Sequence, residues 1–317
     1  MVMSLVPFAA QALTVSPPKI ELTADPGKTI SGSFLVSNEQ QSKKTFYTTF
    51  ENFEAQGETG VPKFVAATEG LGAWITGVSQ VTLDPGQEKK IDFQIHVPRN
   101  AEPGGHFAGI FLGTSPPEMQ GGGQVSVGAK IGVLVFLRVS GNIPEGGHLL
   151  GFGTSQKVFA HLPVNFWYRF QNGGADRVKP DGIISITHLL VRTHHKVSAN
   201  KAESNVLPYT TRRLEVPWVI DPILDATGAA LPPVEPLGFW ANVGYEWKHF
   251  AFGPYSATLD FTYGATKTPV HATTHFYVIP WQLLIIIFLV IIIIGLFGSV
   301  GIRRYNRWII AKARASR

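Results

Sequence analysis

Apolar and polar residues alternate in short runs over most of the chain, which is the pattern of half-buried β-strands. Ile30, Phe34 and Val36 have the same parity, so they share one face of an extended segment. Gly, Pro, Asn and Asp separate the runs, and no segment between Thr14 and His275 keeps an apolar period of about 3.6 residues. We therefore predict an all-β fold for this part of the chain.

The predicted strands form two groups, separated by the Pro- and Gly-containing stretch 144–147. About seven short strands in a domain of this size are typical of an immunoglobulin-like β-sandwich. We predict two such domains, over residues 13–141 and 146–276. The expected strands lie near residues 20–22, 30–36, 44–53, 78–83, 91–97, 106–114 and 124–140 in the first domain, and near 148–153, 166–170, 183–191, 211–219 and 256–263 in the second.

The sequence Asp-Pro-Gly occurs twice in the first domain, at 25–27 and at 84–86. Pro at the second position and Gly at the third favour a type II turn. In each case an apolar strand precedes the turn and an alternating strand follows it. We therefore predict that both turns close β-hairpins of one sandwich.

The run from Trp281 to Ile302 is uncharged, and its first half, Leu283 to Ile294, consists only of Leu, Ile, Val and Phe. As a helix with a rise of about 1.5 Å per residue, this run is roughly 33 Å long and can cross a hydrocarbon core of about 30 Å. A lone span in lipid is helical, because a helix pairs its own backbone groups. We predict one transmembrane helix over 281–302, anchored in the lipid bilayer by residues that include Trp281, Leu283, Ile294 and Ile302.

The charges beside this run predict its direction. Between residues 262 and 280 the only Lys or Arg is Lys267, whereas residues 303–317 are strongly basic and contain no acid. The positive-inside rule places this basic tail in the cytoplasm and the preceding domains outside it. The basic residues that carry this topology signal are Arg303, Arg304, Arg307, Lys312, Arg314 and Arg317.

Residues 1–12 are apolar and end in Ala10-Gln11-Ala12, the small-x-small pattern of a signal-peptidase site. They lack a basic opening region, so we interpret them as the remnant of a secretory signal peptide whose start lies upstream of Met1. The alternative is a chain without a signal, with a C-terminal tail anchor and a cytosolic body. The charge asymmetry beside the apolar run opposes that alternative.

The net charge of +5 does not indicate a nucleic-acid partner, because the excess is local. Six of the 27 Lys and Arg residues lie in the tail, which leaves 21 against 22 Asp and Glu in the rest of the chain. The domains are therefore electrically balanced. The chain contains no Cys, which excludes disulfides, thiolate metal sites and Cys nucleophiles.

No arrangement of residues points to catalysis. The chain has no nucleophile motif, phosphate-binding loop or dinucleotide fingerprint, and glycines 121–123 fit a turn better than a phosphate cradle. We therefore predict a protein that is not an enzyme and that binds no cofactor or metal. Two groups have metal-ligand chemistry but are explained as well by strand ends and turns: His188, His194 and His195, and Asn172, Asp176 and Asp181.

One stretch near the membrane is rich in aromatic residues. If it is a strand, Val243, Tyr245 and Trp247 share one face, and core packing is the interpretation we favour. Binding of a partner by exposed aromatics and contact with the membrane surface are the alternatives, with Trp240 as a further contact residue. The aromatic residues are Phe239, Trp240, Tyr245, Trp247, Phe250 and Phe252.

Several short motifs, in this order along the chain, resemble those of the WxL-interacting proteins of Gram-positive bacteria. In the first domain they are Glu21-Leu22 before Pro26-Gly27, and Val97-Pro98 leading to 104–109; in the second they are 207–210 and 253–257. The resemblance implies a peptidoglycan-binding first domain, a second domain that contacts a protein, and a membrane anchor at the cell surface.

We therefore expect a single-pass bacterial cell-membrane protein whose domains form an extracytoplasmic binding or adhesion scaffold. Peptidoglycan and a surface or secreted protein are the expected partners, and nucleic acid is not. The alternative is a membrane-tethered, chaperone-like assembly factor that presents a sheet edge to a client strand. Gly295 and Ser299 form a small-xxx-small pair that permits a homodimer through the transmembrane helix.

Overall fold

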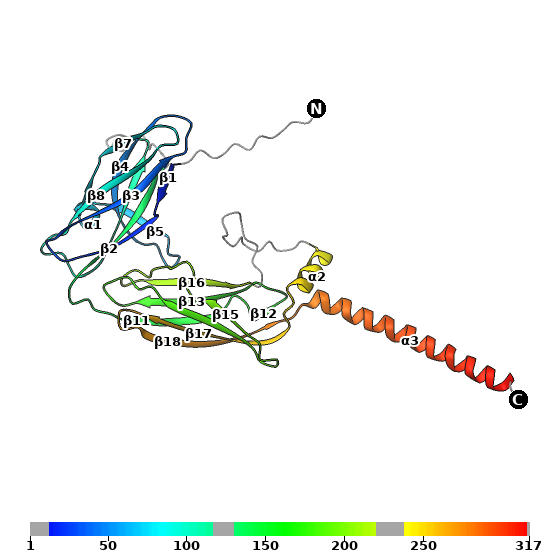
Figure 1. The fold of residues 1–317 in the computed structure, drawn as a ribbon. Helices are drawn as coiled ribbons and strands as arrows, with labels where there is room; N and C mark the ends of the chain where they lie inside the picture. Colours follow the sequence, from blue (N-terminus) through cyan, green and yellow to red (C-terminus); the bar gives the residue numbers. More distant parts are fainter. Residues whose placement is uncertain (1–12, 117–129, 220–237, 316–317) are drawn as a thin grey trace, which may run out of the picture.

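The computed structural model describes residues 13–116, 130–219 and 238–315. In these residues the chain forms two immunoglobulin-like β-sandwiches followed by one long helix, which confirms the predicted fold class (Figure 1). The predicted signal remnant and the glycines at 121–123 lie outside the described residues.

The described part of the first sandwich consists of two facing sheets. One sheet has the strand order β1-β3-β8-β6, and the other has the order β2-β10-β9-β4-β5, with β7 also paired to β4. Buried residues of both sheets, such as Phe34, Phe93 and Val135, form one core. The elements are β1 (Leu13–Ser16), β2 (Lys19–Ala24), β3 (Thr29–Asn38), β4 (Lys44–Ala55), β5 (Pro62–Ala66), α1 (Leu71–Trp74), β6 (Ile75–Gly77), β7 (Gln80–Leu83), β8 (Glu88–His96), β9 (Gly104–Gly113) and β10 (Lys130–Val139).

The two Asp-Pro-Gly sequences form turns, but not hairpins. Gly27 and Gly86 have positive φ angles of 76° and 70°, as the third position of a type II turn requires. However, β2 pairs with β10 while β3 pairs with β1 and β8, so the turn at 25–27 crosses from one sheet to the other. The turn at 84–86 likewise joins β7 to β8 across the sandwich. The hairpin prediction was wrong because each strand buries its apolar face between the sheets, and pairing with its sequence neighbour is not required.

The second sandwich has a sheet of order β11-β13-β16 and a sheet of order β12-β18-β17-β14-β15. Its core is strongly aromatic, with Tyr168 and Trp218 buried between the sheets. The Tyr168 hydroxyl donates to the carbonyl of Ala199 at 3.2 Å, and burial raises its pKa. The strands are β11 (Gly147–Thr154), β12 (Val158–Phe159), β13 (Val164–Asn172), β14 (Asp181–His188), β15 (His194–Ser198), β16 (Thr211–Trp218), β17 (Gly253–Tyr263) and β18 (Thr268–Val278).

Charged groups join the two sandwiches. Arg177 donates to Glu21 at 3.0 Å, and Arg138 donates to Asp176 at 2.8 Å. Burial raises the pKa of Glu21, but hydrogen bonds from Lys19 and Arg177 and the charges of both residues outweigh burial and lower it to about 2. The junction is therefore polar and depends on ionised carboxylates.

Two helices lie at the end of the second sandwich. Helix α2 (Phe239–Lys248) precedes β17, and helix α3 (Trp281–Ala315) follows β18 directly and leaves the sandwich as a long rod (Figure 1). The tail predicted from residue 303 onward continues this helix to Ala315.

Candidate functional site

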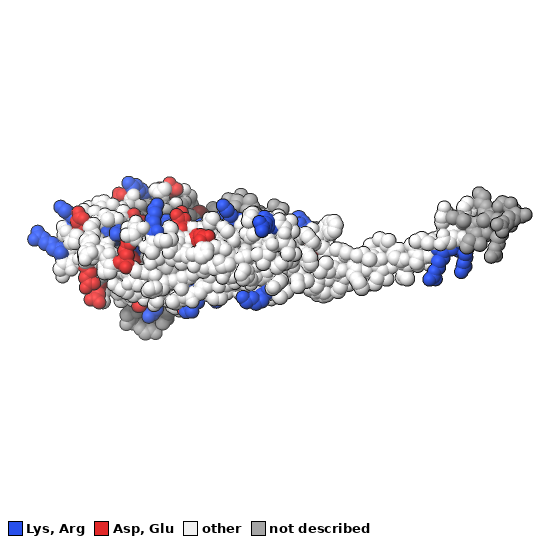
Figure 2. Space-filling model, turned by 90° about the horizontal axis from the view of Figure 1, so that it is seen from below, with Lys and Arg blue, Asp and Glu red and all other residues white. Residues whose placement is uncertain are grey.

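Helix α3 is long and apolar enough to cross a membrane from Trp281 to Trp308, and among the described residues it is the only helix that is. Trp281, Ile294 and Ile302 are exposed along it, as lipid-facing residues should be, whereas Leu283 is buried. Arg303, Arg304 and Arg307 follow the apolar part within the same helix, and so does Lys312. Figure 2 shows α3 as a white rod with blue basic side chains near its far end.

The aromatic stretch at 239–248 is a helix, and the predicted core strand is wrong. On a helix Val243 and Trp247, four residues apart, share a face, whereas Tyr245 lies on the other side. Trp240 and Trp247 are 73% and 72% exposed, while the Tyr245 ring packs against His161 with the ring centroids 5.1 Å apart. The apolar periodicity of the sequence does not predict this helix, because its inner face carries polar residues, among them the buried Glu246.

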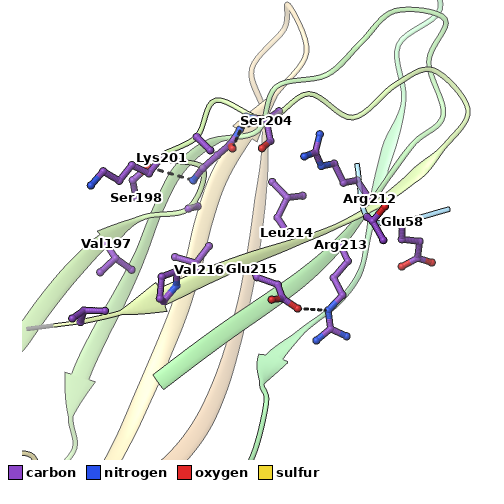
Figure 3. Close-up of a pocket in the computed structure, with 16 residues that line it drawn as sticks. Glu58, Val197, Ser198, Lys201, Ser204, Arg212, Arg213, Leu214, Glu215 and Val216 are labelled. Atoms are coloured by element: carbon purple, nitrogen blue, oxygen red, sulfur yellow. Dashed lines mark hydrogen bonds and ion pairs between the residues drawn. The ribbon is translucent and has the colours of Figure 1, made fainter. Parts of the chain in front are cut away.

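A groove that the sequence did not indicate lies between β15 and β16, the edge strands of the two sheets of the second sandwich. It encloses a cavity of about 1160 Å³ and has an apolar floor formed by Val197, Ala199, Leu214 and Val216. Charged and polar residues from Ser198 to Ser204, and from Arg212 to Glu215, line its rim (Figure 3).

Among the residues that the structure describes, no strand pairs with the outward edge of β16 along this groove. In an antiparallel ladder, successive residues direct their N–H and C=O groups alternately toward one neighbour and the other. The N–H of Arg213 donates to the carbonyl of Glu58 in the first sandwich at 2.9 Å, so positions 213, 215 and 217 point away from β13. Among the described residues, no backbone–backbone bond occupies the N–H of Glu215. Pro217 has no N–H to offer, which fits an edge strand.

Glu58 reaches this edge from the loop between β4 and β5, and an ion pair with Arg169 holds it there. The Arg169 Nε donates to Glu58 Oε2 at 2.7 Å, and a second guanidinium nitrogen donates to Oε1. The pKa of Glu58 is lowered, chiefly by the hydrogen bonds from Arg169. The loop thus makes one strand-like bond at the Arg213 end of the groove, and within the described parts of the chain no other backbone–backbone bond reaches the outward edge of β16.

Sequence reasoning found β16 but missed β15 and the groove. The sequence predicts one strand from 183 to 191, whereas β14 ends at His188 and the chain turns back to form β15. The available signal was Pro217, because Pro inside a strand is confined to edges and bulges.

Of the candidate metal ligands, His188, Asp176 and Asn172 have structural partners. His188 Nε2 lies 2.7 Å from the carbonyl of Phe252, and its Nδ1 accepts N–H groups of Leu190 and Val191 at 3.1 Å. Asp176 is bonded to Arg138, and Asn172 binds backbone groups. No group of three His, Asp or Glu residues that could hold a metal ion occurs in the described parts of the chain.

No protein-family model and no curated protein sequence matches the chain. In structure it is similar to fimbrial chaperones. The class 5 fimbriae chaperone CfaA is 11% identical over 84% of this chain and 99% of its own, with a TM-score of 0.39. The E. coli chaperone DraB is 9% identical over 85% and 97%, with a TM-score of 0.36, and the Pseudomonas aeruginosa CupB2 chaperone is 8% identical over 84% and 100%, with a TM-score of 0.35. At this low sequence identity the similarity does not indicate what this chain binds. A binding partner has to be inferred from the chain's own residues.

Proposed function

We propose that the protein is a membrane-tethered binding protein that takes up an extended segment of a partner protein as an additional strand on β16. The observation that supports this most directly is the edge of β16, where a backbone without a partner strand in the described part of the chain lies beside an apolar floor. Backbone hydrogen bonds supply affinity in strand addition, and pockets for alternate side chains supply selectivity. The groove offers both, because Glu215 presents its backbone and Leu214 and Val216 form the floor.

Substitutions at Glu215 test this proposal without disturbing the ladder to β13. Glu215→Pro removes the outward N–H, whereas the matched control Glu215→Ala removes only the side chain and its ion pair with Arg213. The probe is a panel of ten-residue fluorescent peptides that alternate apolar and polar residues, with Pro-interrupted versions as blanks. Binding to the full chain should fall at least tenfold in Glu215→Pro and little in Glu215→Ala. No binding by any peptide, or equal binding by the two variants, refutes strand addition.

The same proposal places both sandwiches outside the cytoplasm, with α3 as the tether. Its support is the apolar length of α3 and the basic residues that begin at Arg303. Because the chain has no Cys, a single introduced thiol reports its compartment. A membrane-impermeant maleimide should label Val61→Cys in intact cells and Ala311→Cys only after permeabilisation. The reverse pattern would place the sandwiches in the cytoplasm.

Contact of the first sandwich with peptidoglycan, which the family resemblance implies, stays a prediction. Sedimentation of the chain with purified cell walls tests it. Retention that persists in Glu215→Pro would assign wall binding to a surface other than the groove.

A further inference from the structure

Helix α2 has its polar and apolar faces reversed relative to a helix on a water-exposed surface. Glu246 is 1% exposed, whereas Trp240 and Trp247 are 73% and 72% exposed. A surface helix in water buries its apolar stripe and exposes its charges. The outward face of α2 is therefore matched to an apolar medium.

The buried carboxylate fixes α2 to the start of the tether. Glu246 Oε2 accepts the N–H of Leu283 at 2.7 Å, and Leu283 is the third residue of α3. A carboxylate at this position satisfies an unpaired N–H of the first helical turn and complements the helix dipole. Because α3 enters the membrane here, α2 lies at the membrane boundary.

An apolar groove of about 460 Å³ separates α2 from α3. Its walls include Val243, Gly244 and Trp247 of α2, and Ile287, Val290 and Ile291 of α3. Ile291 follows Trp281 by ten residues, or roughly 15 Å along the helix axis at about 1.5 Å per residue. The groove therefore extends to a depth at which lipid acyl chains surround α3.

A second apolar element lies at the same end of the sandwich (Figure 1). The turn between β14 and β15 exposes Leu190 and Val191, at 77% and 71%. His188 accepts the N–H groups of both residues and is bonded to the carbonyl of Phe252, which is itself exposed. The imidazole thus joins the turn to the segment that follows α2, so the two elements form one surface.

We propose that this surface, the outer face of α2 with the turn at 189–191, inserts into the lipid interface of the leaflet that α3 enters, and that acyl chains fill the α2–α3 groove. The proposal rests on the tether proposed above, because only a membrane-spanning α3 holds this end of the sandwich at a bilayer. Interfacial helices use the same residue types, with Trp and Phe in the lipid and Lys or Arg at its boundary. Arg192 and Lys248 are exposed beside the apolar residues.

Continuity with α3 favours lipid over a protein partner or a second copy of the chain. A partner protein would cover the aromatic residues only while bound, whereas the bilayer covers them permanently. Figure 2 shows no acidic side chain beside the start of α3 on the face in view, and acidic residues gather at the opposite end of the molecule. On this face, the described residues beside the start of α3 carry no negative charge that would repel anionic headgroups.

Single-Cys variants of the full chain in nanodiscs test the proposal, since no native thiol interferes. A bimane label is placed at Trp240→Cys or Leu190→Cys, with Phe288→Cys in α3 and Val61→Cys in the first sandwich as references. The nanodiscs contain phosphatidylcholine with or without brominated acyl chains. Labels at 240 and 190 should show at least half of the bromolipid quenching seen at 288, and position 61 should show none.

The references separate the two ways in which the experiment can fail. If position 288 is quenched while 240 and 190 respond only to aqueous iodide, the lipid-inserted surface is refuted and the tether stands. If position 288 is not quenched, the tether itself is refuted. Protection of 240 and 190 from both quenchers in nanodiscs that hold two copies, but not in those that hold one, would assign the surface to self-association instead and overturn the proposal.

Discussion

Replacing Pro217 should make the β16 edge a better acceptor of an added strand. Position 217 points away from β13, in step with Arg213 and Glu215, so Pro217→Ala introduces an N–H that faces the groove. The ladder between β13 and β16 loses no hydrogen bond. The substitution therefore changes what the edge offers to a partner and leaves the sheet behind it intact.

The size of the effect follows from one additional backbone hydrogen bond. A net contribution of about 0.5–1.5 kcal/mol corresponds to roughly two- to tenfold tighter binding. Loss of the Pro ring restraint acts on folding in the opposite direction, since the unfolded chain gains freedom worth about 0.4–1 kcal/mol. Tighter peptide binding together with slightly lower stability is therefore the expected result.

Fluorescence anisotropy with the alternating peptides measures the affinity, and thermal unfolding followed by circular dichroism measures the stability. Glu215→Pro is the opposite control, because it removes a donor from the same row. An affinity of Pro217→Ala that equals or falls below that of the unmodified chain would show that bound segments do not pair with β16. Equal peptide affinities of Glu215→Pro and Pro217→Ala would also show that bound segments do not pair with β16.

Three further predictions concern the junction, the tether and the core. Ionised Glu21 and Glu58 have lowered pKa values, so their contribution to the junction is complete above the ordinary value of 4.5 and is lost as the pH falls toward the folded-state pKa, about 2 for Glu21. A fluorophore pair with one label on each sandwich should report separation in this range, and Glu21→Gln with Glu58→Gln should reduce the pH response to what the Asp176–Arg138 pair contributes. Glu246→Ala leaves the Leu283 N–H without its carboxylate and should cost about 1–3 kcal/mol; faster hydrogen exchange in α2 is the readout, and Glu246→Gln should lose less. Trp218→Ala should destabilise the second sandwich by about 3–5 kcal/mol in denaturant titrations, because its ring fills the core beside Tyr255 and Phe276; a loss below about 1 kcal/mol would contradict this packing.

Alternation along the sequence predicts most strands, because a strand that is buried on one face needs alternate apolar residues. Phe34 and Val36 in β3, and Phe166 and Tyr168 in β13, show the pattern clearly. The same pattern does not identify the partner strand. For this reason the sequence predicts hairpins at 25–27 and 84–86, although these turns join opposite sheets.

The candidate sites were harder to predict because each depends on an exception to the usual rule. Helix α2 has polar residues such as Glu246 inside and Trp240 outside, so a search for a buried apolar stripe misses it. The groove depends on which strands are at the edges of the sheets, and this is a property of the whole topology. Only Pro217 marks the edge locally.

The direction of β16 relates helix α2 to the groove between β15 and β16. The groove extends from Glu58 at the first sandwich toward Trp218. The Trp218 ring packs against His195, with the ring centroids 5.4 Å apart. His195 belongs to β15, which starts after the turn at 189–191 that we propose inserts into lipid. A segment bound beside β16 therefore runs between the first sandwich and the membrane-proximal end. A sandwich held by α3 alone could tilt about the residues before Trp281, whereas the Glu246–Leu283 bond and insertion of α2 remove that freedom. Because freedom lost on binding weakens affinity, a groove held at a fixed height and angle binds a membrane-proximal partner at a smaller entropic cost than a freely tilting one.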